Sequence, residues 1–322
     1  MSQNTPYPIL TLRHQVLESG LNDVLKRANI TDPHGINQMM GLMKKQFNHS
    51  AYFDKKGDQQ AISNREFTDD KGKISTFKQQ AQSILDNITN TSFMRSLKKS
   101  GMLPDITLKM DTNDSYQASA DYDEKHGQYV IKMSSGCFNP KNYDGHITSD
   151  KINNLLAKDL GHELGHLIVR SYEANTFKSH GLEGNTPISD PVLNGILRIK
   201  SIESAEAVPP AQKQGRLNGE EILCDIIGGI CAKQSGYSLD PVSNYYQKKS
   251  KTLGSNDFAT HHPSAKDRAD SLILTDTYCR RGLKNILRSH QTPVAHTEQP
   301  QHTTNTTGTL SMYTLRQSKN TH

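Results

Sequence analysis

Apolar residues recur at helical spacing within the first hundred residues of the chain. Two stripes place an apolar side chain at every third or fourth position, which is the period of one face of an α-helix. Their members are Ile36, Met39, Met40, Met43 and Phe47, followed by Phe77, Ala81, Ile84, Leu85 and Ile88. The polar residues 54–72 between the stripes are expected to form a loop. We therefore predict a mostly helical region over residues 1–100, with the methionines in its core.

The pattern changes to alternation after residue 101. Apolar residues occupy every second position over 106–110, as in a half-buried strand. Two more extended runs follow at 117–122 and 128–134, and the turn between them contains Gly127, which can adopt a positive φ. The expected product is a small antiparallel sheet.

The strongest helical pattern is INNLLAKDLGHELGHLIVR at residues 152–170, which carries a core-facing stripe of leucine and isoleucine. A further apolar helical run opens near residue 218. The chain is therefore predicted to be an α+β protein, mostly helical, with the small antiparallel β-sheet next to the 152–170 helix. We expect two ordered parts, a helical region at 1–100 and a second domain at 101–288.

Residues 289–322 have a different composition. They consist mainly of Thr, Gln, His, Asn and Ser and show almost no apolar periodicity. Such a segment cannot bury enough surface to offset the entropy lost on ordering. We expect a disordered polar tail.

Composition narrows the class of protein. Only 33% of the residues are hydrophobic, and no apolar stretch approaches the ~20 residues of a membrane-spanning helix. The first thirteen residues lack the features of a signal peptide. The net charge is +5, and the lysine pairs are scattered along the chain, which argues against a nucleic-acid-binding surface. We expect no membrane span and no nucleic-acid partner, in a protein that is cytoplasmic or exported without a classical signal peptide, for instance into a host cell.

The four cysteines contain no CxxC pair and do not suggest a disulfide framework. Cys224 and Cys231 fall within an apolar helical segment. We interpret them as buried free thiols, which favours a reducing compartment.

Residues 162–166, HELGH, form an HExxH motif inside the predicted helix. Residues four apart share one helix face, so His162 and His166 can bind the same metal ion. Glu163 can accept a proton from a metal-bound water without being a ligand. A zinc ion needs a third protein ligand, with the fourth position left open for water.

The third ligand is expected from a later helix. The longer HExxHxxGxxH signature is excluded, because Val169 and Tyr172 stand where it requires glycine and histidine. Glu221 and Asp225, four residues apart in the apolar run, can complete the site: Glu221 as a ligand, and Asp225 as hydrogen-bond acceptor for the outer nitrogen of a ligating histidine. Glu220 is expected to point away from the site; it fits an acidic first helical turn better than Asp225 does and is the fallback ligand.

The motifs HELGH at 162–166 and EILCD at 221–225 together resemble the HExxH and ExxAD pair of the M48 family of zinc metallopeptidases, which are gluzincins. Cys224 stands where the family pattern has alanine. Downstream, His262, Pro263 and Arg268 match the family's HPxxxxR motif. The resemblance covers about residues 105–275, and the ordered combination is more specific than any single motif.

The resemblance implies a zincin-type fold and a zinc-dependent endopeptidase with one zinc ion per chain. His162, His166 and Glu221 would hold the zinc, and Glu163 would be the general base. His262 or Arg268 would stabilise the oxyanion. A polypeptide substrate would bind in extended form along an edge strand within 117–134.

Two other interpretations remain open. One is a zinc-binding interaction module that has lost turnover, although Glu163 would then have no purpose. The other is a helical structural protein in which HELGH is accidental. The pairing of Glu221 with Asp225 and the HPxxxxR match would then be coincidences.

Overall fold

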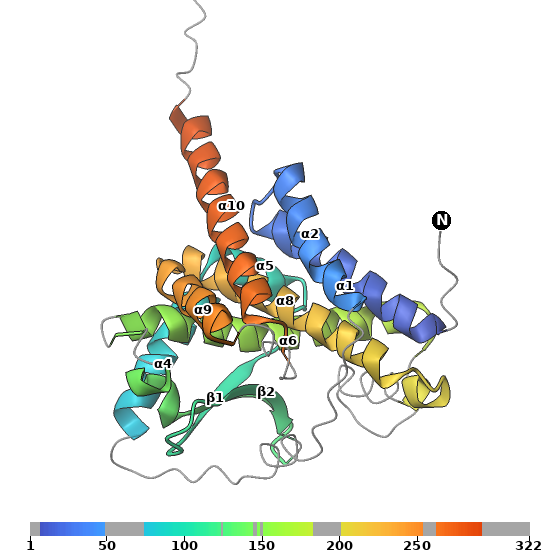
Figure 1. Cartoon of the computed structure of the whole chain (residues 1–322), viewed down its shortest axis with the longest axis horizontal. Coiled ribbons are helices and arrows are strands. Elements are labelled where there is room, and N and C mark those ends of the chain that lie inside the picture. The colour runs from blue at the N-terminus through green and yellow to red at the C-terminus, as the bar shows by residue number, and fades with distance from the viewer. Residues whose placement is uncertain are drawn as a thin grey trace, which may run out of the picture.

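Two long helices, α6 (Ile152–Ser179) and α8 (Pro210–Gln234), form the centre of the structure, and the other elements pack around them (Figure 1). As predicted, the protein is α+β and mostly helical, with one small sheet. The computed structural model describes residues 7–48, 74–123, 125–143, 147–148, 151–182, 201–253 and 262–291. Both central helices are almost entirely buried along their middle turns.

Glycines allow α6 and α8 to approach each other closely. A methyl group on Gly161 would lie 2.7 Å from Cβ of Cys231, and one on Gly228 would lie 2.5 Å from the backbone oxygen of Lys158. These separations are shorter than carbon atoms tolerate, so a side chain at either position would force the helices apart. The backbones of α6 and α8 therefore touch directly at these points.

The helices described before the sheet are α1 (Pro8–Arg27), α2 (Pro33–Phe47), α4 (Ile74–Thr89) and α5 (Ser92–Lys99). The two predicted apolar stripes lie in α2 and α4, and Met39 and Met43 are fully buried, which confirms the helical interpretation of this region. Both stripes belong to the same hydrophobic core as α6 and α8. The core therefore continues across residue 100, where the sequence suggested a domain limit.

The sheet lies on one side of α6 and has the strand order β1-β3-β2, formed by β1 (Ile106–Asp111), β2 (Ala118–Asp123) and β3 (Gln128–Ser134) (Figure 1). β2 and β3 form the predicted antiparallel hairpin, with Gly127 at a φ of 63° in its turn. β1 pairs in parallel with β3, however, so the prediction of a wholly antiparallel sheet is wrong. The most buried strand, β3, occupies the centre of the sheet. The chain therefore runs from β1 to the far edge, where it forms β2, and the hairpin then places β3 between the two.

The remaining elements connect and cover this arrangement. The 3₁₀ turns η1 (Ser135–Phe138) and η2 (Pro140–Tyr143) follow the sheet, and residues 201–205 form a further helical segment before α8. Near the C-terminus, α9 (Asp240–Leu253) packs against α10 (Ala265–Gln291), which also packs against α8. All four cysteines are free and buried, as predicted for Cys224 and Cys231.

Two predicted segments lie wholly or mostly outside the described residues. The loop expected at 54–72 is one of them. Of the tail expected from 289, only the first three residues are described, and they are helical, because α10 continues to Gln291.

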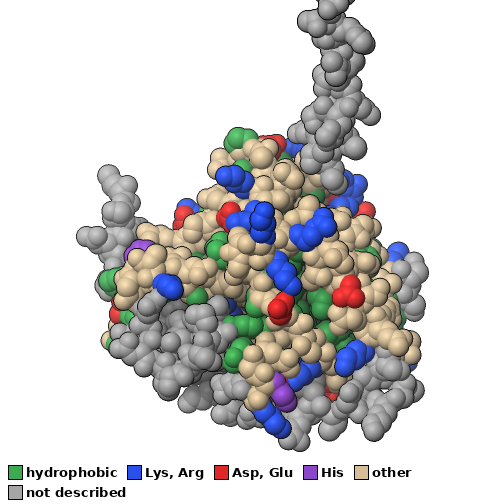
Figure 2. Space-filling model, turned by 180° about the vertical axis from the view of Figure 1, so that it is seen from behind, with side chains coloured by type: hydrophobic (Ala, Val, Ile, Leu, Met, Phe, Trp, Pro, Cys, Tyr) green, Lys and Arg blue, Asp and Glu red, His purple; other side chains and the backbone are tan. Residues whose placement is uncertain are grey.

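Charged side chains of both signs occur on the surface. On the face in Figure 2, lysine and arginine side chains are interspersed with aspartate and glutamate. In the part of the chain that the structure describes, no helix is both long and apolar enough to cross a membrane.

Replacing Gly228 by alanine tests the close contact of the central helices. The added methyl group would meet the backbone of α6 and should lower the free energy of unfolding by about 1–3 kcal/mol, the usual cost of overpacking a core. Chemical denaturation of Gly228→Ala and of the parent protein would measure the change. Gly41→Ala is the matched control, because Gly41 lies in α2 with no atom near the added methyl group. That variant should gain up to about 1 kcal/mol from helix propensity.

Candidate metal centre

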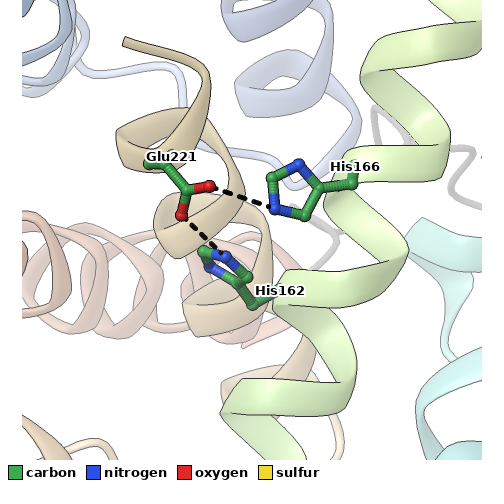
Figure 3. Close-up of side chains that lie close together, drawn as sticks. All are labelled: His162, His166 and Glu221. Atoms are coloured by element: carbon green, nitrogen blue, oxygen red, sulfur yellow. Dashed lines mark ion pairs between the residues drawn. The ribbon is translucent and has the colours of Figure 1, made fainter. Parts of the chain in front are cut away.

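Two histidines of α6 and one glutamate of α8 converge in the structure (Figure 3). The Nε2 atom of His162 lies 3.1 Å from Oε2 of Glu221, and Nε2 of His166 lies 3.4 Å from Oε1 of the same carboxylate. The two imidazoles thus point at the two oxygens of one side chain. These are the three residues that the sequence predicted as metal ligands.

The convergence follows from the helix geometry. His162 and His166 are one turn apart on α6, so their side chains project from the same face. Gly165 lies between them in sequence, and a methyl group there would lie 3.0 Å from Cα of Cys224 on α8. The absence of side-chain bulk at this point allows α8 to bring Glu221 within reach of both imidazoles.

The separations suit a tetrahedral zinc ion. Zinc binds nitrogen and oxygen at ~2.0–2.2 Å, which sets neighbouring donor atoms of a tetrahedron roughly 3.3 Å apart. The ligand atoms of His162, His166 and Glu221 all lie within 4.8 Å of one another. Two imidazoles with one carboxylate are also the ligand set of many catalytic zinc sites, in which water takes the fourth position. These residues can therefore hold a metal ion.

The outer nitrogen of each histidine contacts a carboxylate of α8. Nδ1 of His162 lies 2.9 Å from Oδ1 of Asp225, and Nδ1 of His166 lies 2.9 Å from Oε1 of Glu220. When Nδ1 donates its proton to the carboxylate, Nε2 is left with a free lone pair for a metal ion. Both imidazoles are thus oriented with Nε2 towards Glu221.

Glu220 has a different place from the one we inferred. The helix begins at Pro210 rather than near residue 218, so Glu220 lies in the middle of α8 and not in an acidic first turn. Its side chain is buried, and it binds both His166 and Arg216, whose Nη1 atom lies 2.6 Å from Oε2 of Glu220. The expectation that Glu220 points away from the site is therefore wrong.

Asp225 is fully buried and is surrounded by cations. Oδ1 lies 2.7 Å from Nζ of Lys158, and Arg268 donates two hydrogen bonds, of 2.7 and 2.8 Å, to the two carboxylate oxygens. Burial alone would raise the pKa of Asp225, but the charges of Arg268 and Lys158 hold it well below its usual value. Asp225 therefore remains ionised and can accept a hydrogen bond from Nδ1 of His162.

Lys158 was not identified from the sequence. It stands four residues before His162, in line with the buried face of α6, and its side chain is almost fully buried. Because Lys158 lies one helical turn before His162, on the same face of α6, the sequence already contained a signal that it could bind the acid behind this histidine. The same holds for Arg216, which stands four residues before Glu220 on α8.

Glu163 is buried on α6, directly after the first ligand. Within the described part of the chain, its carboxylate makes no hydrogen bond or ion pair. The other acids of the centre, by contrast, all have cationic or imidazole partners. Among the described residues, Glu163 is therefore the acid of this centre that has no ion-pair partner.

The two residues of the HPxxxxR match contact different acids of this centre. His262 is about half exposed, and its Nδ1 atom lies 3.0 Å from Oε2 of Glu221, so it contacts the ligand group directly. Arg268 lies behind Asp225 and is bound to it through two hydrogen bonds. The structure thus brings His262 to the open side of the site and Arg268 to its supporting side.

A cavity of about 370 Å³ opens beside His262 and Arg268. Four tyrosines contribute to its wall, and the start of β2 forms one rim. The residues that line it are Tyr116, Gln117, Ala118, Asn142, Tyr143, Leu155, Tyr245, Tyr246, Lys249, His262 and Arg268. The cavity therefore extends from the start of an edge strand to His262, which contacts the candidate ligand Glu221; the three candidate ligands themselves do not line it.

A second cluster, formed by His166, Glu220 and Cys224, also has metal-ligand spacing. Here the ligand atom of His166 would be Nδ1, which lies 3.5 Å from Sγ of Cys224 and already contacts Glu220. Burial raises the pKa of Cys224 to about 12, so a metal ion bound there would have to displace the thiol proton. Glu220 is also engaged by Arg216. The first cluster is the better metal site.

Comparisons of this chain with protein-family models, with curated proteins and with solved structures found no match. The chemical interpretation of the centre therefore depends on its geometry and on the motifs in the sequence.

The two clusters predict different effects of substitution. Glu221→Ala removes an anionic ligand and should abolish stoichiometric binding of one divalent metal ion per chain. Cys224→Ala removes only a buried thiol beside Gly165 and should leave the metal content unchanged. Elemental analysis after dialysis against zinc would measure both. Retention of metal in Glu221→Ala together with its loss in Cys224→Ala would assign the ion to the second cluster.

Proposed function

We propose that this protein is a soluble zinc-dependent endopeptidase of the zincin type, similar to the M48 metallopeptidases. The observation that carries the proposal is the convergence of His162, His166 and Glu221, with the buried Glu163 next in sequence to His162 and without an ion pair to any residue that the structure describes. Metal ligands alone would serve a binding protein equally well. A carboxylate without a cation partner next to the ligands supports hydrolysis.

A zinc ion held by these ligands would supply a Lewis acid that acidifies a water molecule and polarises a carbonyl group. Glu163 would accept the proton of the attacking water and transfer it to the departing amine. Asp225 and Glu220 would keep the two imidazoles in the tautomer that leaves Nε2 free. His262, on the open side, could donate a hydrogen bond to the developing oxyanion, whereas Arg268 would act mainly by holding Asp225.

The substrate would bind along the free edge of β2. In the β2–β3 ladder, the amide of Ser134 donates to the carbonyl of Gln117, so Gln117 faces β3. Antiparallel pairing alternates, so the N–H and C=O of Ala118 and Ala120 point away from β3. The carbonyl of Ala120 accepts a hydrogen bond from Arg170 of α6 at this edge.

Ala118 also lines the cavity beside His262. An extended polypeptide could therefore pair with the outward groups of Ala118 and extend one side chain between the tyrosines of the cavity. This arrangement would bring the scissile carbonyl close to the three ligands.

Replacing Glu163 by glutamine tests the proposed base. Glu163→Gln should retain one zinc ion per chain, because no ligand is lost, while peptide hydrolysis should fall by about 10²–10⁴-fold. Cleavage of a mixed peptide library, followed by mass spectrometry, would measure turnover. Glu18→Gln makes the same chemical change on the surface of α1, where Glu18 pairs with Lys44, and should leave activity unchanged. Equal cleavage by Glu163→Gln and the parent would remove Glu163 from the mechanism, and a zinc-loaded parent that cleaves nothing would favour the binding module.

Replacing Ala118 by proline tests the substrate-binding edge. Proline removes an outward N–H at the first residue of an edge strand, a position where it is tolerated, so the β2–β3 ladder should persist. We expect KM to rise or kcat/KM to fall by about tenfold, which corresponds to one lost backbone hydrogen bond of roughly 1.4 kcal/mol. Ala118→Gly keeps the N–H and should behave like the parent. Unchanged kinetics in Ala118→Pro would show that substrate binds elsewhere.

A further inference from the structure

A line of buried charges leads from the N-terminal helix to one of the metal ligands. Arg13 of α1 binds Glu173 of α6, with Nε 2.9 Å from Oε1. The same Glu173 oxygen accepts a hydrogen bond from Nη2 of Arg216 on α8. Arg216 in turn binds Glu220, which contacts Nδ1 of His166. Three helices are thus joined by consecutive hydrogen-bonded ion pairs.

Every charged member of this line is buried. The relative exposures are 9% for Arg13, 2% for Glu173, 2% for Arg216 and 7% for Glu220. Arg13 also binds a further carboxylate, with Nη1 2.5 Å from Oε1 of Glu203. Buried ion pairs gain little net stability, because desolvation offsets most of the attraction, and apolar residues of similar size are often as stable. Stability alone therefore gives little reason for such a line of charges.

The arrangement has a physical consequence for His166. Glu220 can accept a hydrogen bond from Nδ1 of His166 only if its carboxylate stays in place, and Arg216 holds the other carboxylate oxygen. Arg216, however, is shared between Glu220 and Glu173. Without Arg13, Glu173 would depend on Arg216 alone and would draw the guanidinium away from Glu220. Arg13 therefore lets Arg216 serve both carboxylates.

We propose that Arg13 is a positioning residue for His166, acting through Glu173, Arg216 and Glu220, so that helix α1 is an integral part of the metal centre. The inference rests on the proposed function, since it requires a metal ion at His162, His166 and Glu221. It assigns a role to the N-terminal helical region, for which the sequence motifs gave none.

Zinc affinity of the full-length chain, measured by competition with a chromophoric chelator, tests this proposal without depending on peptidase activity. Glu220→Gln should weaken zinc binding by about 10- to 100-fold, as expected for the direct partner of a ligating histidine. Arg13→Met keeps the length of the side chain but not its charge, and should weaken binding by about 2- to 30-fold. Arg13→Lys restores the charge and should recover part of the affinity.

A double variant separates positioning from general stability. If Arg13 acts through Glu220, then Arg13→Met combined with Glu220→Gln should bind zinc no more weakly than Glu220→Gln alone. A merely structural role would lower the unfolding temperature but leave the zinc affinity of the folded chain unchanged. Arg27→Met is the matched control, because Arg27 lies on the same helix and forms an ion pair with Asp23 outside this line.

The outcomes distinguish this inference from the proposed function. Zinc binding by the parent with unchanged affinity in both Arg13 variants, or additive losses in the double variant, would overturn the role of Arg13 and leave the metal centre intact. A parent chain that binds no zinc would overturn both.

Discussion

The direct contact between α6 and α8 determines the rest of the structure. At Gly161, Gly165 and Gly228 no side chain separates the two helices, so their backbones meet. This proximity brings a carboxylate of α8 into reach of two imidazoles of α6. A looser pair of helices would keep the same residues and the same core but would lose the convergence on a single point. The candidate site is therefore a property of the helix interface.

Burying so many polar groups at this interface is costly, and the structure offsets the cost by pairing. Asp225 is neutralised by Lys158 and Arg268, and Glu220 by Arg216, so that each carboxylate can remain ionised behind a histidine. The two histidines are thus supported from opposite ends of the same α8 segment. Glu163 is the contrasting case, buried without such pairing among the described residues, and this contrast is the basis of the proposal that the protein is a hydrolase.

The helices before the sheet contribute to this centre as well as to the core. α1 and α2 pack against α8, and α4 packs against α6, so the hydrophobic core is continuous from the N-terminal region to α10. The buried charges of Arg13 and Glu173 follow the same route as the apolar contacts. The N-terminal region is thus part of the unit that holds the site.

The sequence by itself determined the local features of this protein. Helical periodicity identified α2, α4 and α6, alternation identified β1, and two extended runs around a glycine turn identified the hairpin. The spacing in HELGH and EILCD named His162, His166, Glu221 and Asp225. These patterns depend only on neighbours along the chain. Tertiary structure alone decided the parallel pairing of β1 with β3, the burial of Glu220 in the middle of α8, and the partners Lys158, Arg216 and Arg13. Those features arise from contacts between segments far apart in sequence. The local sequence around a charged residue does not show whether its side chain faces solvent or a buried carboxylate.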